Sequence, residues 1–332
     1  MKKYDVYAVG NALVDTEFEV SDIFFDEYDI EKGCMTLVTK EHQQHLMGIL
    51  KEKYELKKQS GGGSACNTIY ALTHFGGNAF YSCKVADDEV GAFFLKELGD
   101  DKIETSVGKK SEGISGQCLI MVSPDAERTM NTHLGVSENL SIDELDFDAV
   151  RDSKYIYIEG YLVTSISAKS AIIKLKEFAT KSNVKVALTF SDPAVVEYFG
   201  EAVNEVLAGG VDLLFCNEQE LKVWAGTENF ENACAAMSKI ASQFVVTRGS
   251  KGALLFDGEK YINIEGHPVK AIDTNGAGDM FAGAFLYGIT AGHGFEISGR
   301  LASMASAELV TMFGSRLEPE EHTRIKNLVF NS

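Results

Sequence analysis

Short runs rich in Val, Ile, Phe and Tyr alternate with amphipathic or buried helical stretches along most of this chain, and that alternation limits the possible folds most strongly. Runs of this composition are typical of central strands that helices cover on both faces. The pattern predicts a doubly wound α/β fold. The expected strands are 4–10, 78–86, 154–160, 184–190, 211–216 and 243–249, and the expected helices are 64–76, 88–98, 166–180, 229–241 and 279–313.

Two stretches, 16–38 and 114–134, break the alternation, because each has the pattern of strand, turn and strand without an intervening helix. They could be peripheral hairpins that only cover a sheet edge, or a small β lid over the binding edge of the sheet. We favour the lid, formed from about 12–40 and 110–135, on a single domain that spans residues 1–332.

The composition indicates a globular protein that binds small molecules. A net charge of −18 argues against a nucleic-acid or anionic-membrane partner, since both attract clustered Lys and Arg. Six cysteines are spread singly with no CxxC pair, which suggests free thiols in a reducing compartment. The first ten residues show no signal-peptide core, and no stretch has the ~18 uncharged apolar residues of a membrane span. We therefore expect a cytoplasmic protein.

The segment DTNGAGDMFAGAFLYG (273–288) combines a glycine-rich turn with helical spacing of apolar residues. The lysine-bearing phosphate loop GxxxxGK[ST] is absent from the sequence, and a clean GxGxxG is excluded because position 281 is Phe. Gly276, Ala277 and Gly278 remain at an expected strand-to-helix junction, where first-turn amides attract anions. A plain glycine-rich turn capped by Asp279 is the simpler interpretation of this loop alone.

Two carboxylates flank this loop and favour a chemical role. An Asp beside an anion site is repelled by the anion, unless a cation compensates or the Asp removes a proton during a reaction. Phosphoryl transfer needs amides for the developing charge, Mg²⁺ on the phosphates and a base for the acceptor hydroxyl. Asp279, in the first helical turn, is placed to be that base. Asp273, at the expected strand end, is better placed to organise the loop or a cation.

A second glycine cluster lies upstream, in SGGGSACN (60–67). Ser64 could simply cap the helix that follows. Three consecutive glycines, however, are more than a cap needs, and they would let a ligand lie against the backbone while Ser64 and Asn67 offer hydrogen bonds.

These two clusters together resemble the glycine signatures of the ribokinase (PfkB) family of carbohydrate and nucleoside kinases, most closely its adenosine-kinase-like members. VGNALVD (9–15), CNEQE (216–220) and VVTRGSKG (245–252) follow in the family's order, so the resemblance covers essentially the whole chain. It implies a mostly parallel sheet flanked by helices, a β lid, and transfer of the ATP γ-phosphoryl to a primary hydroxymethyl group.

The resemblance assigns roles to the reacting groups by motif match. Asp279 would be the general base, the amides of 276–278 would form the anion hole, and Arg128 on the second lid segment would reach the transferring phosphate. Asp15 would bind the vicinal hydroxyls of a ribose, although alone it would pass for a solvated residue at a strand end. The other expected acceptor-binding residues are Asn11, Gly62, Gly63, Ser64, Asn67, Leu134 and Tyr161.

The resemblance also predicts an ATP side of the site. Asn217 and Glu220 match an NxxE element that acts on Mg²⁺ mainly through water, although the same residues could simply begin a helix. Thr247 and Gly249 would contact the ATP ribose and phosphates, and Gly314 would lie under the adenine. The amides of Gly276 and Gly278 also belong to this side, and Asp273 is a candidate residue of a K⁺-binding loop.

The acceptor is less sharply indicated. Tyr161 and Leu162 stand where two aromatic residues would be expected around adenine, and Met35, Leu37, Cys118 and Leu134 could form an apolar lid pocket or merely the lid core. We predict an ATP- and Mg²⁺-dependent nucleoside kinase of purine salvage, most of all for adenosine. A sugar kinase for ribose, fructose or a related sugar is the alternative, and the oligomer would be a monomer or a lid-mediated homodimer.

Two rival functions fit the sequence less well. A catalytically silent nucleoside sensor would have no use for Asp279, and a dinucleotide-dependent oxidoreductase would lack its fingerprint.

Overall fold

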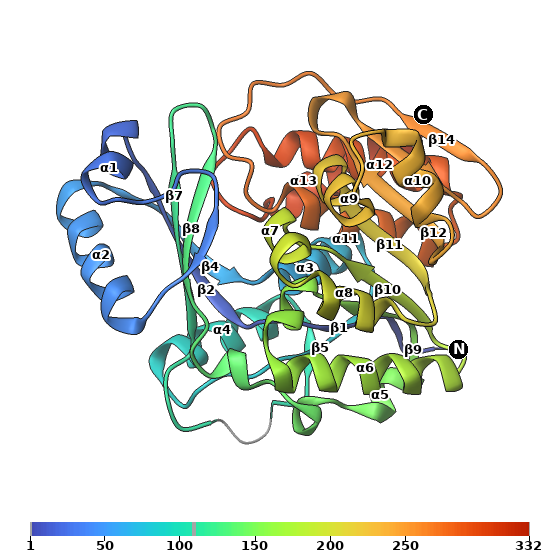
Figure 1. The fold of residues 1–332 in the computed structure, drawn as a ribbon, viewed down its shortest axis with the longest axis horizontal. Helices are drawn as coiled ribbons and strands as arrows, with labels where there is room; N and C mark the ends of the chain where they lie inside the picture. Colours follow the sequence, from blue (N-terminus) through green and yellow to red (C-terminus); the bar gives the residue numbers. More distant parts are fainter. Residues whose placement is uncertain (1, 108–110, 332) are drawn as a thin grey trace.

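The computed structural model describes residues 2–107 and 111–331, which build two β-sheets (Figure 1). The larger sheet has the strand order β14-β13-β12-β11-β10-β9-β1-β5-β6. All neighbours from β6 to β12 are parallel, and only β13 and β14 are antiparallel additions at one edge. Its strands are β1 (Tyr4–Val9), β5 (Ala79–Ser82), β6 (Glu104–Thr105), β9 (Ser153–Ile158), β10 (Lys185–Thr189), β11 (Val211–Asn217), β12 (Ala241–Thr247), β13 (Ala253–Phe256) and β14 (Tyr261–Ile264).

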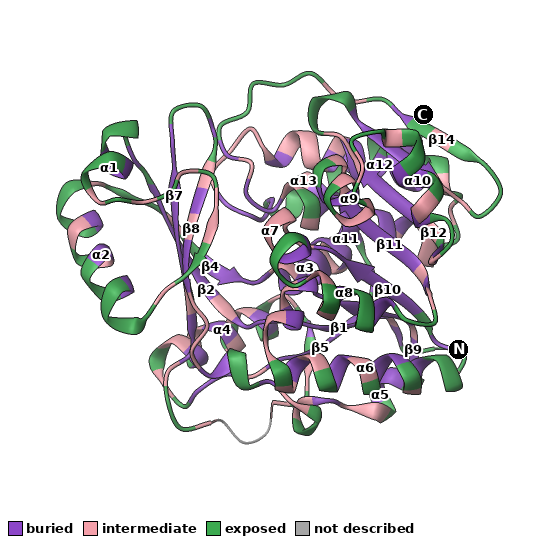
Figure 2. Cartoon of the chain, viewed as in Figure 1, coloured by how far each residue is buried: buried purple, intermediate pink, exposed green. Residues whose placement is uncertain are grey.

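Helices cover both faces of this sheet, and the central strands are buried between them (Figure 2). The apolar core on one face includes α3 (Ser64–Phe75), α4 (Glu89–Asp100), α11 (Ala277–Thr290), α12 (Phe295–Leu309) and α13 (Pro319–Phe330). The core on the other face includes α5 (Phe147–Arg151), α6 (Ile166–Lys181), α7 (Pro193–Tyr198), α8 (Gly200–Leu207), α9 (Glu218–Ala225) and α10 (Phe230–Met237). No helix in the described ranges has both the length and the apolar character that crossing a membrane requires.

Local signals explain several helix ends. Asn217 and Glu220 form a reciprocal capping box at the start of α9, and the side chain of Asp88 accepts a hydrogen bond from the Gly91 amide at the start of α4. Gly76 ends α3 with a φ of +113°, which only glycine adopts readily. These caps set where each helix leaves the edge of the sheet.

The second sheet has five strands in the order β3-β8-β7-β2-β4 and stands beside the larger sheet, at the left of Figure 1. Its strands are β2 (Leu13–Glu19), β3 (Met35–Leu37), β4 (Leu56–Gly62), β7 (Gly116–Val122) and β8 (Arg128–His133). Helices α1 (Asp22–Glu27) and α2 (Lys40–Lys53) cover one face, where Phe18, Leu119 and Met121 pack. Side chains alternate along a strand, so Asp15, Cys118 and Ile120 face the other way.

The strand and helix predictions need several corrections. The strand expected at 78–86 is shorter, because β5 ends at Ser82. The stretch 16–38 contains the short helix α1, and β4 and α2 lie outside the two segments expected to form the second sheet. The stretch 279–313 is two helices, because the chain turns at Gly292 with a φ of +93°. Helix α10 ends at Met237, and β12 begins at Ala241. Residue 110, where the second expected segment begins, and residues 1 and 332 of the expected domain lie outside the described residues.

The parallel strands bring several polar residues to one edge of the larger sheet. The carboxyl ends of β1, β9, β10, β11 and β12 lead into Asn11, Glu159, Ser191, Asn217 and Thr247. Strand β1 pairs with β5 on one side and β9 on the other, so the strand order reverses there. In open α/β sheets the crevice at such a switch point is the usual ligand site.

Candidate active site

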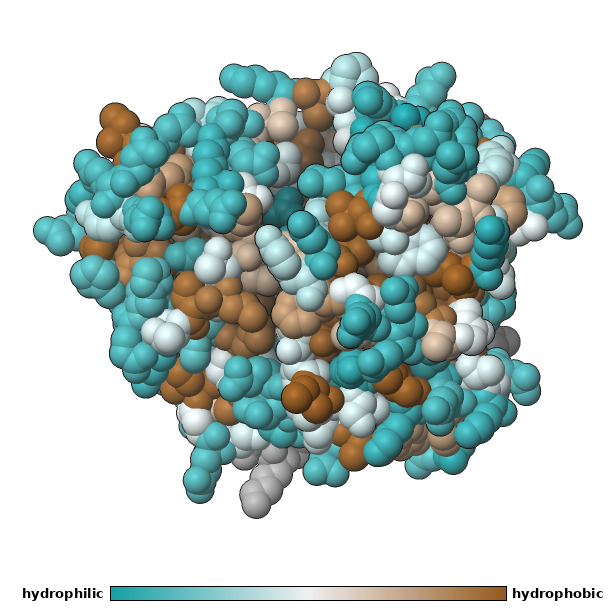
Figure 3. Space-filling view, viewed as in Figure 1, coloured by the Kyte–Doolittle hydropathy of each residue, from teal (hydrophilic) through white to brown (hydrophobic). Residues whose placement is uncertain are grey.

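A cavity of about 660 Å³ lies at this edge, between the larger sheet and the inner face of the second sheet. Figure 3 shows hydrophilic side chains over most of the surface and hydrophobic ones gathered near the hollow between the two parts. The second sheet forms a largely apolar wall of the cavity. That wall comprises Leu13, Met35, Leu37, Cys118, Ile120, Met130, Thr132 and Leu134.

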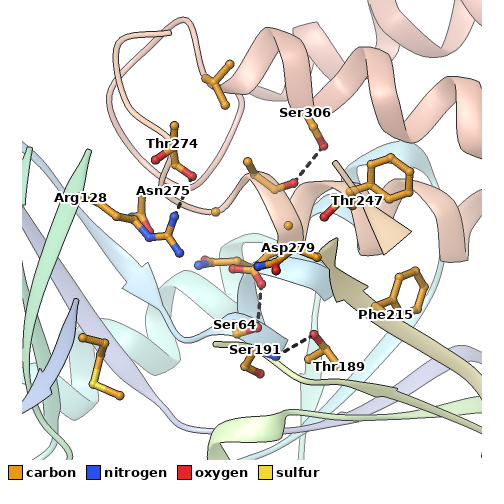
Figure 4. Close-up of a pocket in the computed structure, with 18 of the residues that line it drawn as sticks. Ser64, Arg128, Thr189, Ser191, Phe215, Thr247, Thr274, Asn275, Asp279 and Ser306 are labelled. Carbon is orange, nitrogen blue, oxygen red and sulfur yellow. Dashed lines mark hydrogen bonds between the residues drawn. The ribbon is translucent and has the colours of Figure 1, made fainter. Parts of the chain in front are cut away.

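Asp279 occupies the wall of the cavity in the first turn of α11 (Figure 4). The hydroxyl of Ser64 donates a hydrogen bond of 2.6 Å to its carboxylate. Burial raises the pKa of Asp279 to about 6, although Ser64, Arg128 and Asn67 each oppose that rise. Its carboxylate is therefore mostly ionised at neutral pH and has a basicity suited to accepting a proton.

Backbone amides of the first turn of α11 lie beside this carboxylate, since Gly276, Ala277 and Gly278 all line the cavity. Gly276 caps the helix with a φ of +71°, and a Cβ there would lie 2.7 Å from Ser315 Cα. A Cβ on Gly278 would meet nothing within 4 Å. The amide of Ala277 makes a long hydrogen bond of 3.4 Å to the Thr274 carbonyl. The loop thus leads into the N-terminus of α11, where free backbone amides and the helix dipole favour anions.

Arg128 reaches this loop from the second sheet. It begins β8, lines the cavity and donates a hydrogen bond of 3.3 Å from Nη1 to the Thr274 carbonyl (Figure 4). A guanidinium is always protonated and matches phosphate oxygens. Its contact therefore places a positive charge next to the amides that open α11.

Asp15, from β2, forms the polar part of the wall given by the second sheet. Burial raises its pKa to about 7, Arg316 opposes that rise, and the negative charge of Asp279 adds to it. A Cβ on Gly62 would lie 2.2 Å from the Asp15 carboxylate, so a side chain at that position would displace it. Glycine at position 62 therefore allows the Asp15 carboxylate to occupy this position.

Glu159 anchors the floor of the cavity after β9. Its carboxylate accepts hydrogen bonds of 2.7 Å from Asn11 Nδ2 and 2.9 Å from the Ala65 amide. Gly63, with a φ of +95°, passes so close to the Asn11 carbonyl that a Cβ would lie 2.2 Å from it. Asn11 and the start of α3 are therefore held in fixed positions around the cavity.

The opposite end of the cavity is lined by Asn217, Glu220, Thr247 and Gly249. Both carboxylate oxygens of Glu220 accept hydrogen bonds from Asn217, one of 3.0 Å from its amide and one of 2.8 Å from its side chain. Burial raises the pKa of Glu220 to about 7. Three buried carboxylates and the partly exposed carboxylate of Asp279 thus face one cavity, which makes it suited to a ligand accompanied by a cation. They are Asp15, Glu159, Glu220 and Asp279.

Comparison with known proteins places the chain in a family. The sequence pattern of the pfkB family carbohydrate kinases matches residues 36–322. The chain belongs to this family. Family members are phosphotransferases that use an alcohol as acceptor and ATP as phosphoryl donor, and this chain is a pfkB-family kinase of the adenosine kinase or sugar kinase type.

Three relatives show how far the similarity extends. The chain is 31% identical to a probable sugar kinase protein from Rhizobium etli CFN 42, with a TM-score of 0.91 over 99% of this chain and 100% of the other. It is also 31% identical to adenosine kinase from Sinorhizobium meliloti, with a TM-score of 0.90 over 97% and 99%. In sequence it is 26% identical to adenosine kinase of Saccharomyces cerevisiae, over 87% of this chain and 90% of that protein. The predicted ribokinase-like fold is confirmed.

Within this pfkB-family site, three of the expected residues lie behind the cavity wall. Gly62 lies directly behind the Asp15 carboxylate. Gly314 packs against Lys58, because a Cβ on Gly314 would lie 2.5 Å from Lys58 Cδ. Asp273 is fully buried and does not follow a strand, because β14 ends at Ile264. Its carboxylate accepts hydrogen bonds from the amides of Asn275 at 2.8 Å and Gly314 at 3.0 Å. Asp273 therefore ties two loops together.

The other expected residues line the cavity, and so do the residues proposed for an apolar pocket. They are Asn11, Asp15, Gly63, Ser64, Asn67, Arg128, Leu134, Tyr161, Asn217, Glu220, Thr247, Gly249, Gly276, Ala277, Gly278 and Asp279, together with Met35, Leu37 and Cys118.

Sequence reasoning overlooked several polar residues at the pfkB-family site. Glu159 directly follows a buried strand, a position that could have marked it. Glu17 lies two residues after Asp15 on β2, accepts a hydrogen bond of 3.0 Å from Asn275 Nδ2, and has its pKa raised to about 8 by burial. Its period-two spacing from Asp15 was the available signal. Ser191, with a φ of +71°, gave no signal in the sequence.

Proposed function

We propose that this protein transfers the γ-phosphoryl group of ATP to the 5'-hydroxyl of a ribonucleoside, above all adenosine. The observation that carries the proposal is the position of Asp279: a carboxylate in a cavity wall, in the first turn of a helix, fixed by the Ser64 hydroxyl at 2.6 Å. Few other reactions need a base and an anion site at the same point.

The carboxylate of Asp279 would accept the proton of the 5'-hydroxyl as the hydroxyl oxygen bonds to the γ-phosphorus. The bond between that phosphorus and the bridging oxygen breaks, and ADP leaves with the bonding electrons. Ser64 donates to one carboxylate oxygen, and the remaining lone pairs of the carboxylate can accept the hydroxyl proton. The first-turn amides and Arg128 would stabilise the charge on the transferring group.

Magnesium is expected with the nucleotide, and the donor set fits it. Glu220 is a buried carboxylate that forms no ion pair among the residues the structure describes. The described residues hold no cluster of three or more acidic, His or Cys side chains suited to a metal. In kinases Mg²⁺ usually keeps several waters and is held by substrate phosphates and one or two carboxylates. Glu220 and Asn217 would hold that hydrated ion, which when bound neutralises phosphate charge.

A K⁺ requirement belongs to the same proposal, through the loop that Asp273 organises. Both carboxylate oxygens of Asp273 accept backbone amides, so a cation near it would rely on other oxygens of the loop. Rates of ADP formation measured in KCl and in NaCl at equal ionic strength test the requirement. Equal rates in the two salts would show that K⁺ is not required.

The apolar wall of the second sheet supports a nucleoside over a free sugar. A monosaccharide carries hydroxyls around its ring and would leave them unpaired against Met35, Ile120 and Met130. A nucleobase offers a flat apolar surface to such side chains, while the ribose hydroxyls reach Asp15. The similarity to two proteins named adenosine kinase points the same way. The similarity to a probable sugar kinase keeps a sugar acceptor as the second candidate.

A coupled ADP-release assay with adenosine, inosine, ribose and fructose separates these acceptors. We expect the highest kcat/KM with adenosine. A variant of the apolar wall provides a second test. Ile120→Asn would place a polar amide in this wall and should lower kcat/KM for adenosine more than for ribose. Turnover of sugars alone would defeat the nucleoside proposal, and ligand binding without transfer to any alcohol would defeat the kinase proposal.

A further inference from the structure

Arg316 lies behind the acceptor side of the cavity and takes no part in its wall. Its side chain is 6% exposed and reaches helices α3 and α4. Nε donates to Asn67 Oδ1 at 3.1 Å, Nη1 donates to Glu97 Oε2 at 3.3 Å, and Nη2 donates to Cys66 Sγ at 3.2 Å. Asp101 Oδ2 lies 3.7 Å from Nη1. The guanidinium is therefore fixed on three sides.

The hydrogen bond from Arg316 decides which way the Asn67 side-chain amide points. A guanidinium only donates, so Asn67 must present its carbonyl oxygen to Arg316 and its NH₂ group elsewhere. Asn67 and Asp279 both line the cavity, and the Asn67 side chain lowers the pKa of Asp279. A carboxylate only accepts hydrogen bonds, so the part of Asn67 that favours its ionised form is the NH₂ group. The flipped amide would set an oxygen against the Asp279 carboxylate and the NH₂ group against a cation.

We infer that Arg316 is a positioning residue of the phosphoryl-transfer site: it fixes the Asn67 amide with its NH₂ group toward Asp279 and places a buried positive charge behind Asp15. This inference rests on the proposed role of Asp279 as the base. Arg316 lies 37 positions after Asp279 in the sequence and outside the cavity wall.

The charge of Arg316 acts on the acceptor side as well. Burial raises the pKa of Asp15, and Arg316 is the cation that opposes this rise. The rise in the pKa of Asp279 is opposed in the same way by the Ser64 hydrogen bond, by the charge of Arg128 and by the Asn67 side chain. The two carboxylates also repel each other. The other titratable groups that interact with Asp279 are Tyr157, Glu159, Tyr161 and Glu220, and those that interact with Asp15 include Glu17, Glu97, Cys118 and Asp273.

The three consecutive glycines upstream of α3 fit this arrangement. A Cβ on Gly61 would lie 3.0 Å from Glu97 Oε2 and 3.3 Å from Arg316 Nη2. The amide of Gly61 also donates to that Glu97 oxygen. Gly61 thus makes room for the Arg316–Glu97 pair, Gly62 for the Asp15 carboxylate and Gly63 for the Asn11 carbonyl. Each glycine accommodates a different group around the acceptor.

The test measures kcat/KM for adenosine as a function of pH in Arg316→Met, with Arg300→Met, an exposed arginine on α12, as the matched control. We expect the acidic midpoint of the Arg316→Met profile to rise by about 0.5 to 1 pH unit, since an opposing charge and an oriented donor are lost. The loss in kcat/KM should be about tenfold at pH 6 and smaller at pH 8.5. Arg316→Lys keeps the charge without the planar fork and should recover part of the loss.

A double-mutant cycle shows whether Arg316 acts through Asn67. In an Asn67→Ala background, Arg316→Met should lower kcat by no more than about twofold further. If Arg316→Met fails to fold because Glu97 is left unpaired, Glu97→Gln/Arg316→Met removes that charge and serves instead. A uniform loss with an unmoved acidic midpoint, or additive effects with Asn67→Ala, would overturn the inference. Full activity of Asp279→Asn would instead refute the proposed base. The orientation of Asn67 by Arg316 would then be tested by the same double-mutant cycle, with the Kd of adenosine as the measured quantity.

Discussion

Replacing Asp279 with Asn should stabilise the folded protein while removing its activity. Burial raises the pKa of this carboxyl from 3.8 to about 6, so keeping it ionised in the native state costs free energy. One pH unit corresponds to about 1.4 kcal/mol, which gives a cost of at most about 3 kcal/mol above pH 6. Asn removes the charge and can still accept the hydrogen bond from Ser64.

The sign of the pH dependence makes this prediction specific. Below about pH 3 the carboxyl is mostly protonated in both the folded and unfolded states, and its contribution vanishes. As the pH rises from about 3 to 6 the unfolded state loses the proton first, so the wild type becomes progressively less stable relative to the variant. Above pH 6 the difference is constant.

Denaturant unfolding of both proteins at several pH values between 4.5 and 8 provides the measurement. We expect Asp279→Asn to be about 1 to 3 kcal/mol more stable than the wild type at pH 8, and this difference to shrink to about a third of that value at pH 4.5. Asp26→Asn, at an exposed position on α1, is the control and should show no such trend. If Asp279→Asn were less stable than the wild type by the same amount at pH 4.5 and pH 8, burial of the ionised Asp279 would not cost folding free energy, and the prediction would be wrong.

Three further predictions concern the same cavity. The value of kcat/KM for adenosine should fall as the pH drops below about 7, because Asp15 (pKa about 7) and Asp279 (pKa about 6) must both be ionised; a flat profile from pH 5 to 8 would contradict these roles. Asp15→Ala should raise KM for adenosine at least about tenfold, measured against an unchanged KM for ATP. Gly276→Ala, strained at a φ of +71° and 2.7 Å from Ser315, should destabilise by about 1 to 3 kcal/mol in thermal unfolding, whereas Gly278→Ala, whose Cβ meets nothing, should not.

The sequence predicted the larger sheet well because its signal is local. The central strands are mostly apolar between helical stretches, as in SKYIYI and VDLLFCN, and burial on both faces favours that composition. The second sheet was harder to predict, since β4 reads LKKQSGG, with polar and glycine residues on an edge strand. Its pairing with β2 depends on contacts distant in sequence, which no local pattern records.

The break between α11 and α12 shows another limit of pattern reading. Apolar spacing continues on both sides of Gly292 and Gly294, so periodicity alone joined two helices into one. The φ of +93° at Gly292 decides the turn, and a glycine permits but does not require that conformation.

The site could be predicted only where chemistry and motif coincide. Asp279 and the amides before it were found because phosphoryl transfer needs them together. Arg316 was missed, because a single arginine in a loop has the same pattern whether it is solvated or buried against Asn67 and Glu97. Asp273 was found as a loop organiser, but its partner amide on Gly314 is 41 residues away and emerges only from the fold.

The most direct test of the central claim is phosphoryl transfer itself, followed by ³¹P NMR with ATP and adenosine for the wild type and Asp279→Asn. We expect the wild type to form ADP and AMP, Asp279→Asn to lower kcat by about 10²- to 10⁴-fold, and adenosine to bind both proteins with similar Kd. Equal rates in the two proteins, or no AMP from the wild type while ATP and adenosine both bind, would contradict the central claim.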